Sequence, residues 1–344
     1  MKLARLVKCA STSILMLAGA VAAHGQPGTP TGPAPTHADL AYAPADPTQS
    51  NGHLLDLYLP ERTEAAVPVV IWTSGSAWFA DTGKSRAEIA AAELNPLGFA
   101  VAGVSIRSSA QVQFPGQLHD IKAAIRWLRS NAADYGFDPH RIAIMGDSSG
   151  GWTTAIAAVT GDVPELEGDI GVTGVSSAVQ AAVAFFPPTN FLEMDRWALR
   201  PCDAGAGVGA GTAFCHDDET SPESRLIGCA IQTCPERVQR ANPANYISEA
   251  DPPIMILHGN SDPLVPHNQG ELLYQALNKA CHESVFISLP TAGHGPSNGF
   301  LTDDRIRTAA TRRSTSAEGC TTQEPMPFTP TWSALAEFLM RSFA

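Results

Sequence analysis

Two adjacent serines, Ser148 and Ser149, follow a short apolar run in the glycine-rich segment IAIMGDSSGGW. Only Ser148 matches the pattern Gly-x-Ser-x-Gly, with Gly146 and Gly150 at the outer positions. In that pattern a strand ends in a tight turn, and the turn presents the serine hydroxyl above the edge of a sheet. A hydroxyl becomes a good nucleophile when a base removes its proton and a carboxylate orients that base. Ser148 therefore predicts a histidine and a carboxylate elsewhere in the chain.

Asp262 and His294 are the candidates for these two roles. Asp262 lies in HGNSDPLVP, directly after the apolar run at 252–259, and His294 lies between two glycines after the run at 284–290. Alone, Asp262 could be a turn former and His294 an ordinary loop residue. Together, and each behind a predicted strand, they favour nucleophilic catalysis. His258, at the end of its predicted strand, is expected to be structural.

The order of these residues distinguishes two classes of hydrolase. One residue fewer would turn the segment into Gly-Asp-Ser-Gly-Gly, the string around the nucleophile of trypsin-like proteases. Those proteases need the order His, Asp, Ser on an all-β fold, whereas α/β-hydrolases have the order Ser, Asp, His. This chain has the second order, so the likeness to the protease string is accidental.

The elements that must position these residues alternate between strands and helices. Short apolar runs typical of buried strands occur between helices with one apolar face. This alternation predicts an α/β fold, a mostly parallel central sheet with helices on both faces and functional residues at the carboxyl ends of the strands. The order Ser, Asp, His assigns it to the α/β-hydrolase type. The expected strands are 53–60, 67–74, 99–106, 141–146, 179–186, 252–259 and, as the last, 284–290; the expected helices are 84–95, 117–132, one that begins near Ser149, 268–279 and 331–342.

Four regions are expected along the chain. Residues 1–23 have a basic start, an apolar run and small residues for cleavage, the pattern of a secretory signal peptide. Residues 24–50, rich in Pro, Gly, Thr and Ala, indicate a flexible leader. Residues 51–344 form the predicted catalytic domain, with a cap-like insertion at 190–250 over the active site. We therefore expect an exported protein, secreted or periplasmic.

Six cysteines remain after the predicted cleavage, and an even number in an exported protein predicts three disulfides. Of the possible pairings we expect that of sequence neighbours: Cys202–Cys215, Cys229–Cys234 and Cys281–Cys320. Such staples suit an insertion that cannot bury a core of its own. The cysteines lack the spacing of a zinc site, so no metal is expected.

Charge and composition limit the partners. The chain has a formal net charge of -12 with 44% hydrophobic and 16% charged residues, which indicates an acidic globular protein with a full core. Negative charge repels nucleic acid and anionic membrane surfaces, so neither is an expected partner. The predicted chemistry needs no cofactor, and the expected partner is an ester substrate, either a small molecule or one linked to a polymer.

Longer segments resemble the BD-FAE-type esterases, close to the hormone-sensitive-lipase-like branch of the α/β-hydrolases. The resemblance rests on LDLYLP, FPGQLHDIKAAIRWLRSNAADYGFDPHRIAIMGDSSGG, TGDVPELEG, FFPPTNFLEMD and PPIMILHGNSDPLVPHNQ, and it extends from about residue 50 to the C-terminus. It implies a serine ester hydrolase with Ser148, Asp262 and His294 as the catalytic triad.

The chain departs from this family in the loop that should bind the oxyanion. Such esterases usually carry His-Gly-Gly-Gly-Trp after the first buried strand, whereas this chain has Ser-Gly-Ser-Ala-Trp at 74–78. Oxyanion donors are main-chain N–H groups, which can survive these substitutions. We expect the donors to be Gly75, Ser76 and Ser149, whose N–H rather than hydroxyl matters. The alternative is an altered loop with fewer donors.

Four aromatic residues are candidates for an apolar or aromatic acyl pocket, although each could equally belong to the core: Trp78, Phe79, Trp152 and Phe191. The expected activity is hydrolysis of short-chain or aromatic-acyl esters through an acyl-enzyme. Two alternatives stay open. The first is a small serine peptidase or amidase on the same fold, and the second is a non-catalytic binding protein on a hydrolase scaffold.

Overall fold

The structure, a computed structural model, describes residues 32–61, 65–161, 163–202 and 215–344. The predicted signal peptide (1–23) lies outside these residues, as do residues 24–31 of the predicted leader. None of the helices in the described ranges is long and apolar enough to cross a membrane.

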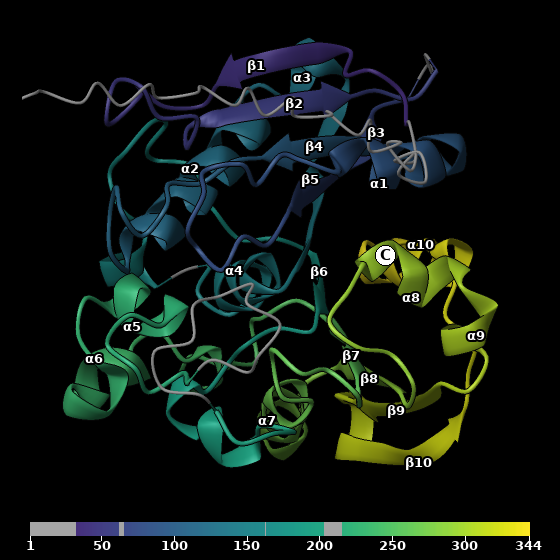
Figure 1. The fold of residues 1–344 in the computed structure, drawn as a ribbon. Coiled ribbons are helices and arrows are strands. Elements are labelled where there is room, and N and C mark those ends of the chain that lie inside the picture. Colours follow the sequence, from purple (N-terminus) through teal and green to yellow (C-terminus); the bar gives the residue numbers. More distant parts are fainter. Residues whose placement is uncertain (1–31, 62–64, 162, 203–214) are drawn as a thin grey trace, which may run out of the picture. The chain divides into compact units, whose positions relative to one another are not determined.

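The described residues form a sheet of ten strands in the spatial order β1-β2-β4-β3-β5-β6-β7-β8-β9-β10 (Figure 1). The strands from β4 to β8 pair in parallel, and the pairs at both edges of the sheet are antiparallel. The predicted α/β fold with a mostly parallel sheet is therefore confirmed. The strands are β1 (His37–Ala41), β2 (Leu54–Tyr58), β3 (Val67–Thr73), β4 (Ala100–Val104), β5 (Phe137–Asp147), β6 (Ala181–Phe185), β7 (Ile254–Gly259), β8 (Ser284–Leu289), β9 (Thr311–Ser316) and β10 (Thr321–Pro327).

Helices cover both faces of the sheet because side chains alternate along each buried strand. Val69 and Ile71 of β3 belong to a hydrophobic cluster with α2, α4 and α7. Val70 and Trp72 belong to a second cluster with α1, α8 and α10, on the other face (Figure 1). The helices are α1 (Ala87–Leu94), α2 (Gly116–Ser130), α3 (Ala132–Tyr135), α4 (Ser149–Ala158), α5 (Pro222–Ile227), α6 (Pro235–Gln239), α7 (Asn268–Lys279), α8 (Ser297–Thr302), α9 (Asp304–Arg307) and α10 (Trp332–Ser342).

The parallel pairing places the three candidate catalytic residues at one edge of the sheet. Ser148 directly follows β5, Asp262 follows β7 and His294 follows β8. These strands run in the same direction, so their carboxyl ends meet at the same edge. The fold thereby brings Ser148 close to His294, which lies 146 positions further along the chain.

Two predictions about the outer strands are wrong. Part of the segment predicted as a flexible leader forms β1, and Tyr42, which follows β1, is buried with its hydroxyl donating to the carbonyls of Gly52 (2.6 Å) and Ser105 (2.7 Å). The strand at 284–290 is also not the last, because β9 and β10 extend the sheet beyond it. β9 and β10, TRRSTS and TTQEPMP, are polar outer strands of the sheet, which lack the apolar runs that predict buried strands.

The insertion at 190–250 consists of short helices and loops that rest on the main core. Phe191, Leu226 and Ile231 are buried in the same cluster as α2, α4 and α7. Besides α5 and α6, its described part holds the 3-10 turns η3 (Phe191–Glu193), η4 (Asp195–Trp197), η5 (Ile231–Thr233) and η6 (Pro243–Asn245). The insertion thus depends on the domain beneath it for burial, as its sequence suggested.

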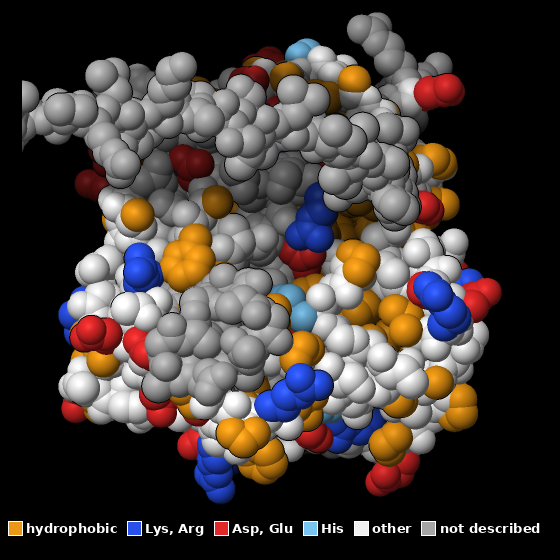
Figure 2. Space-filling model, viewed as in Figure 1, with side chains coloured by type: hydrophobic (Ala, Val, Ile, Leu, Met, Phe, Trp, Pro, Cys, Tyr) orange, Lys and Arg blue, Asp and Glu red, His pale blue; other side chains and the backbone are white. Residues whose placement is uncertain are grey.

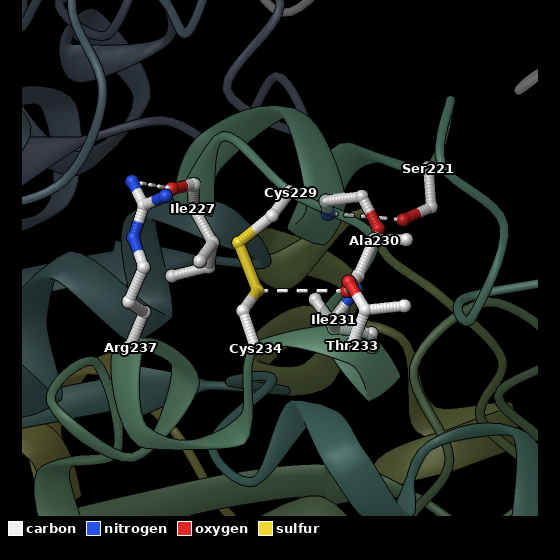
Figure 3. The surroundings of a disulfide bond; sticks show 9 residues. Ser221, Ile227, Cys229, Ala230, Ile231, Thr233, Cys234 and Arg237 are labelled. Carbon is white, nitrogen blue, oxygen red and sulfur yellow. Dashed lines mark hydrogen bonds between the residues drawn. A yellow bond between two sulfur atoms is a disulfide. The ribbon is translucent and has the colours of Figure 1, made fainter.

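All three predicted disulfide pairs are confirmed: Cys202–Cys215, Cys229–Cys234 and Cys281–Cys320. Figure 3 shows the Cys229–Cys234 bridge, which joins the end of α5 to the start of α6. Beside it, Arg237 of α6 donates a hydrogen bond to the carbonyl of Ile227 (2.6 Å). The bridge and this bond hold the two short helices together.

The length of the loop that a bridge closes predicts how much stability is lost when that bridge is removed. Cys281–Cys320 closes a separation of 39 residues, and Cys229–Cys234 one of 5. Closing these loops lowers the entropy of the unfolded chain, which stabilises the fold by about 4 kcal/mol for the first bridge and about 2 kcal/mol for the second. We expect the double alanine variant of Cys281 and Cys320 to lose more unfolding free energy in urea than that of Cys229 and Cys234. Equal losses, or the reverse order, would contradict this expectation.

Candidate active site

Ser148 lies on a sharp turn between β5 and α4, with φ 56° and ψ -124°. A residue other than glycine rarely adopts a positive φ, and such strained conformations persist only where the surroundings enforce them. Here the surroundings leave no room for side chains at Gly146 and Gly150, because a Cβ would lie 2.4 Å and 2.1 Å, respectively, from the carbonyl oxygen of Thr73. The two glycines of the motif thus let β5 and α4 approach the end of β3 closely.

His294 connects the serine hydroxyl to the carboxylate. Its Nε2 lies 3.0 Å from the Ser148 Oγ, and its Nδ1 lies 2.8 Å from the Asp262 Oδ2. Since a carboxylate only accepts, Nδ1 carries the proton, and Nε2 of the neutral ring can accept the hydroxyl proton of Ser148. The ring of Phe186 lies 4.7 Å from the imidazole. The structure therefore brings all three predicted residues into one hydrogen-bonded line, an arrangement that can activate a serine for attack on a carbonyl.

Asp262 is held as a buried carboxylate, only 1% exposed. Its Oδ1 accepts hydrogen bonds from the N–H groups of Leu264 and Val265, both at 2.9 Å. Burial alone would raise the pKa of Asp262, but the imidazoles of His258 and His294 outweigh it and hold the pKa far below its usual range. His258 is itself buried and lies 3.0 Å from the Val265 carbonyl through Nε2, which fits the structural role expected for it.

Two of the three predicted oxyanion donors are engaged within the protein. The N–H of Gly75 donates to the Asp147 Oδ1 (2.7 Å), and that of Ser76 donates to the Ser149 Oγ (2.9 Å). The prediction for Gly75 and Ser76 is therefore wrong in this conformation, and the Ser149 hydroxyl has a role that was not expected. The N–H of Ser149, the third predicted donor, has no acceptor among the described residues, and neither has that of Ala77.

Ala77 is the residue that the sequence analysis missed in this loop. It stands where the family pattern has its third glycine, and it has φ 52° without being glycine. Trp78 follows with φ 56°. Two consecutive left-handed residues turn the chain back toward the nucleophile, and Ala77 lines the same cavity as Ser148. The family usually carries a glycine at this position, and a glycine marks a backbone with positive φ. That pattern could have pointed to Ala77 as an oxyanion donor.

Asp147 and Arg86 hold the loop against the nucleophile. The buried Asp147 accepts hydrogen bonds from Gly75 and from the hydroxyl of Ser297 (3.1 Å) on the other side of the site. Arg86, the residue before α1, contacts both carboxylate oxygens of Asp147 (3.0 and 2.9 Å) and the hydroxyl of Ser74. The family's histidine is absent at position 74, and Arg86 reaches the serine that replaces it. No local pattern marks Arg86, because its partner lies 61 positions away.

A cavity of about 440 Å³ lies beside Ser148 and His294. Figure 2 shows a hollow at the centre of one face, where a histidine, a basic and an acidic side chain gather. The cavity wall is largely apolar, with polar groups from the catalytic residues and from the insertion. Its lining includes Ala77, Trp78, Arg86, Phe186, Pro188, His216, Pro222, Glu223, Leu264 and Val265.

Of the four aromatic residues predicted for the substrate pocket, Trp78 alone lines this cavity. Trp152 and Phe191 are 0% and 1% exposed, and both pack edge-on against Trp78 and tilted against each other, so they form the core behind the wall. Phe79 is 40% exposed outside the cavity, with the Arg225 guanidinium 5.6 Å from its ring centre. The prediction is therefore wrong for Phe79, Trp152 and Phe191.

Within the described residues, one group has the spacing of a metal site. It consists of Asp195, Cys202 and Cys215, whose ligand atoms lie within 4.8 Å of one another. Both cysteines belong to one disulfide, so neither can supply the thiolate that a metal would need. The Asp195 carboxylate instead accepts hydrogen bonds from the N–H groups of His216 and Asp217.

The BD-FAE family model matches residues 55–277, which span β2 to α7 and include Ser148 and Asp262. The chain belongs to the BD-FAE family. Esterase LipQ of Mycobacterium tuberculosis is 28% identical over 264 residues, which cover 74% of this chain and 56% of LipQ. The isoprenylcysteine alpha-carbonyl methylesterase ICME of Arabidopsis thaliana is 25% identical over 281 residues, which cover 73% of this chain and 62% of ICME. The chain thus spans about half the length of the curated relatives it matches first.

Solved structures agree with this BD-FAE assignment. A truncated carbohydrate esterase from gut microbiota is 31% identical with a TM-score of 0.71, covering 91% of this chain and 99% of that protein. A bifunctional GH43-CE protein of Bacteroides eggerthii is 35% identical with a TM-score of 0.67, covering 76% of this chain and 36% of that protein. The relatives and neighbours named here are all esterases or carry a carbohydrate-esterase part, and the BD-FAE chain shares the α/β-hydrolase superfamily with them.

The contacts of Arg86 predict a role in positioning the loop at 74–78. We expect Arg86→Met to lower kcat for p-nitrophenyl acetate by roughly 10-fold with little change in KM, because it removes charged hydrogen bonds that hold Asp147 and Ser74. The exposed Arg341 of α10 provides the control, and Arg341→Met should leave both constants unchanged. An unchanged kcat in a folded Arg86→Met protein would exclude the positioning role.

The lowered pKa of Asp262 predicts how stability changes with pH. A carboxylate whose pKa is lower in the folded than in the unfolded state stabilises the fold above the unfolded value, near 3.9, and this contribution is lost as the pH falls through the folded value. The difference in unfolding free energy between the wild type and Asp262→Asn should therefore be largest above about pH 5 and shrink below about pH 4. Urea unfolding at a series of pH values measures it. A difference that grows on acidification would contradict the assignment.

Proposed function

We propose that this chain is a serine carboxylic-ester hydrolase that works through an acyl-enzyme. The observation that carries the proposal is the hydrogen-bonded line from Ser148 through His294 to Asp262 at the carboxyl edge of the sheet. The family and its esterase relatives support the same activity. The three residues then form a catalytic triad.

The first half of the reaction transfers the acyl group to the enzyme. The Oγ of Ser148 attacks the ester carbonyl while Nε2 of His294 takes its proton, and Asp262 stabilises the resulting imidazolium. The tetrahedral intermediate collapses as the carbon–alkoxide bond breaks. His294 gives the proton to the departing alkoxide, and the alcohol leaves behind a Ser148 ester.

The second half uses water in place of the alcohol. His294 takes a proton from the water as it attacks the acyl-enzyme, and it returns the proton to Ser148 Oγ when the acid is released. In both halves the negative oxygen needs donors, and we assign these to the N–H groups of Ser149 and Ala77. Removing one such donor costs roughly 2.7–4 kcal/mol of transition-state stabilisation in comparable enzymes.

The substrate and the compartment are further parts of the proposal. A cavity of about 440 Å³ is at the small end of ligand sites, which favours a short acyl group over a long lipid chain. The three disulfides favour an oxidising compartment, and the basic start and apolar run of residues 1–23 favour export.

A nitrophenyl-ester assay tests the proposed activity. We expect turnover of p-nitrophenyl acetate to fall by roughly 10⁴-fold or more in Ser148→Ala, because the nucleophile is lost. The matched control is Ser333→Ala on the exposed face of α10, which should be unchanged. Ester turnover that survives in Ser148→Ala would contradict the mechanism, and faster turnover of p-nitroacetanilide than of the ester would indicate an amidase.

A further inference from the structure

The cavity beside Ser148 holds a second pair of titratable residues, which the triad does not use. His216 and Glu223 come from the insertion, and both line the cavity. They are 4% and 3% exposed, and the His216 Nδ1 lies 3.1 Å from the Glu223 Oε2. Much of the surrounding wall is apolar, with Phe186, Pro222 and Val265 among its members. A buried ionic pair in such a wall is costly unless it is firmly held.

The neighbouring backbone holds this pair in place. The N–H of His216 donates to the Asp195 Oδ1 (2.8 Å), and the preceding residue, Cys215, is bonded to Cys202. On the other side, the Ser221 hydroxyl accepts from the N–H of Ser224 (3.0 Å) and caps the helix that carries Glu223. Both members of the pair are therefore fixed in the cavity wall before any substrate arrives.

The charges within the pair largely cancel. Burial lowers the pKa of His216, but the Glu223 carboxylate outweighs burial and raises the pKa above its usual value. When His216 is protonated, its charge balances that of the carboxylate, and the pair then presents little net charge. A pair of this kind attracts a cationic substrate weakly, but it can still accept hydrogen bonds.

Glu223 retains capacity to accept such a bond. The Oε2 of the carboxylate faces His216, and among the described residues no other group donates a hydrogen bond to the carboxylate. A carboxylate can accept about four hydrogen bonds. Because Glu223 lines the cavity, a hydroxyl of the substrate can donate the hydrogen bond that the carboxylate is still able to accept.

We propose that Glu223, positioned by His216, accepts a hydrogen bond from a free hydroxyl of the substrate. The substrate class is then the short-chain ester of a sugar or another polyol, which retains free hydroxyls near the acylated oxygen. Glu223 determines specificity for the alcohol part, while Ser148 and His294 perform the chemistry. This inference rests on the proposed ester-hydrolase function.

Paired substrates with and without free hydroxyls test the proposal. Acetate release is measured from the mono-O-acetyl methyl xylosides and from the same compounds with their free hydroxyls methylated. We expect the wild type to prefer the free-hydroxyl compounds in kcat/KM by roughly 10- to 100-fold, the range of one hydrogen bond to a charged group. Glu223→Leu should abolish the preference, and Glu223→Gln should retain part of it because its amide oxygen still accepts a weaker bond.

Two controls separate specificity from folding and from the general reaction. Turnover of p-nitrophenyl acetate, which has no free hydroxyl to donate, is the reference for each Glu223 variant, and the effect of the substitution is the change in each xyloside's kcat/KM relative to that reference. Glu219, an exposed carboxylate four positions earlier, is the matched residue, and Glu219→Leu should behave as the wild type on every substrate.

Several results would overturn the proposal. A preference that persists in Glu223→Leu would show that methyl groups are excluded by size alone. A preference for acetylcholine that is lost in Glu223→Gln would assign the carboxylate to a cation instead. If the Glu223 variants lose p-nitrophenyl acetate turnover as well, the residue supports the fold rather than specificity. Turnover that continues in Ser148→Ala would instead contradict the ester-hydrolase function, on which this inference rests.

Discussion

The structure depends on how closely the end of β3 approaches the turn that carries Ser148. The Thr73 carbonyl occupies the space that a Cβ would need at both Gly146 and Gly150. Gly75 is equally constrained, since a Cβ there would lie 2.4 Å from the Asp147 carbonyl oxygen. This contact between two parallel strand ends places the loop at 74–78 directly against the nucleophile. Without it, the serine and the donors for its oxyanion would have no fixed relation to each other.

Charged groups then fix what the backbone contact brings together. Asp147 connects the loop at 74–78 to Arg86 on one side and to Ser297 on the other. Asp262 holds His294 in a similar way. One of its carboxylate oxygens contacts the imidazole, and the other accepts hydrogen bonds from two backbone N–H groups. Each carboxylate is buried and satisfied, so each acts as a rigid support, because removing a partner would leave a costly unpaired group. The catalytic geometry is thus assembled before substrate binds, as electrostatic catalysis requires.

The sequence predicted the features that leave a local signature. Apolar runs marked the buried strands, and glycines beside Ser148 and His294 marked the turns where the site forms. Polar outer strands such as β9 carry no such run, and hydrophobicity alone could not separate a core residue such as Trp152 from the cavity wall. The contacts of Arg86 join residues far apart in the chain, so only the folded structure reveals them. For the same reason, spacing placed the loop at 74–78 near Ser148 but could not show that the Gly75 N–H is already occupied.

Covalent labelling with a fluorophosphonate, followed by peptide mass spectrometry, tests the central claim most directly. The probe reacts with a serine hydroxyl only when a neighbouring base activates it, so it reports the nucleophile without any assumption about the substrate. The account predicts one label per chain, on Ser148, and its loss in His294→Ala. A label on Ser149 or another serine, or an unlabelled Ser148 in protein that still hydrolyses esters, would contradict it.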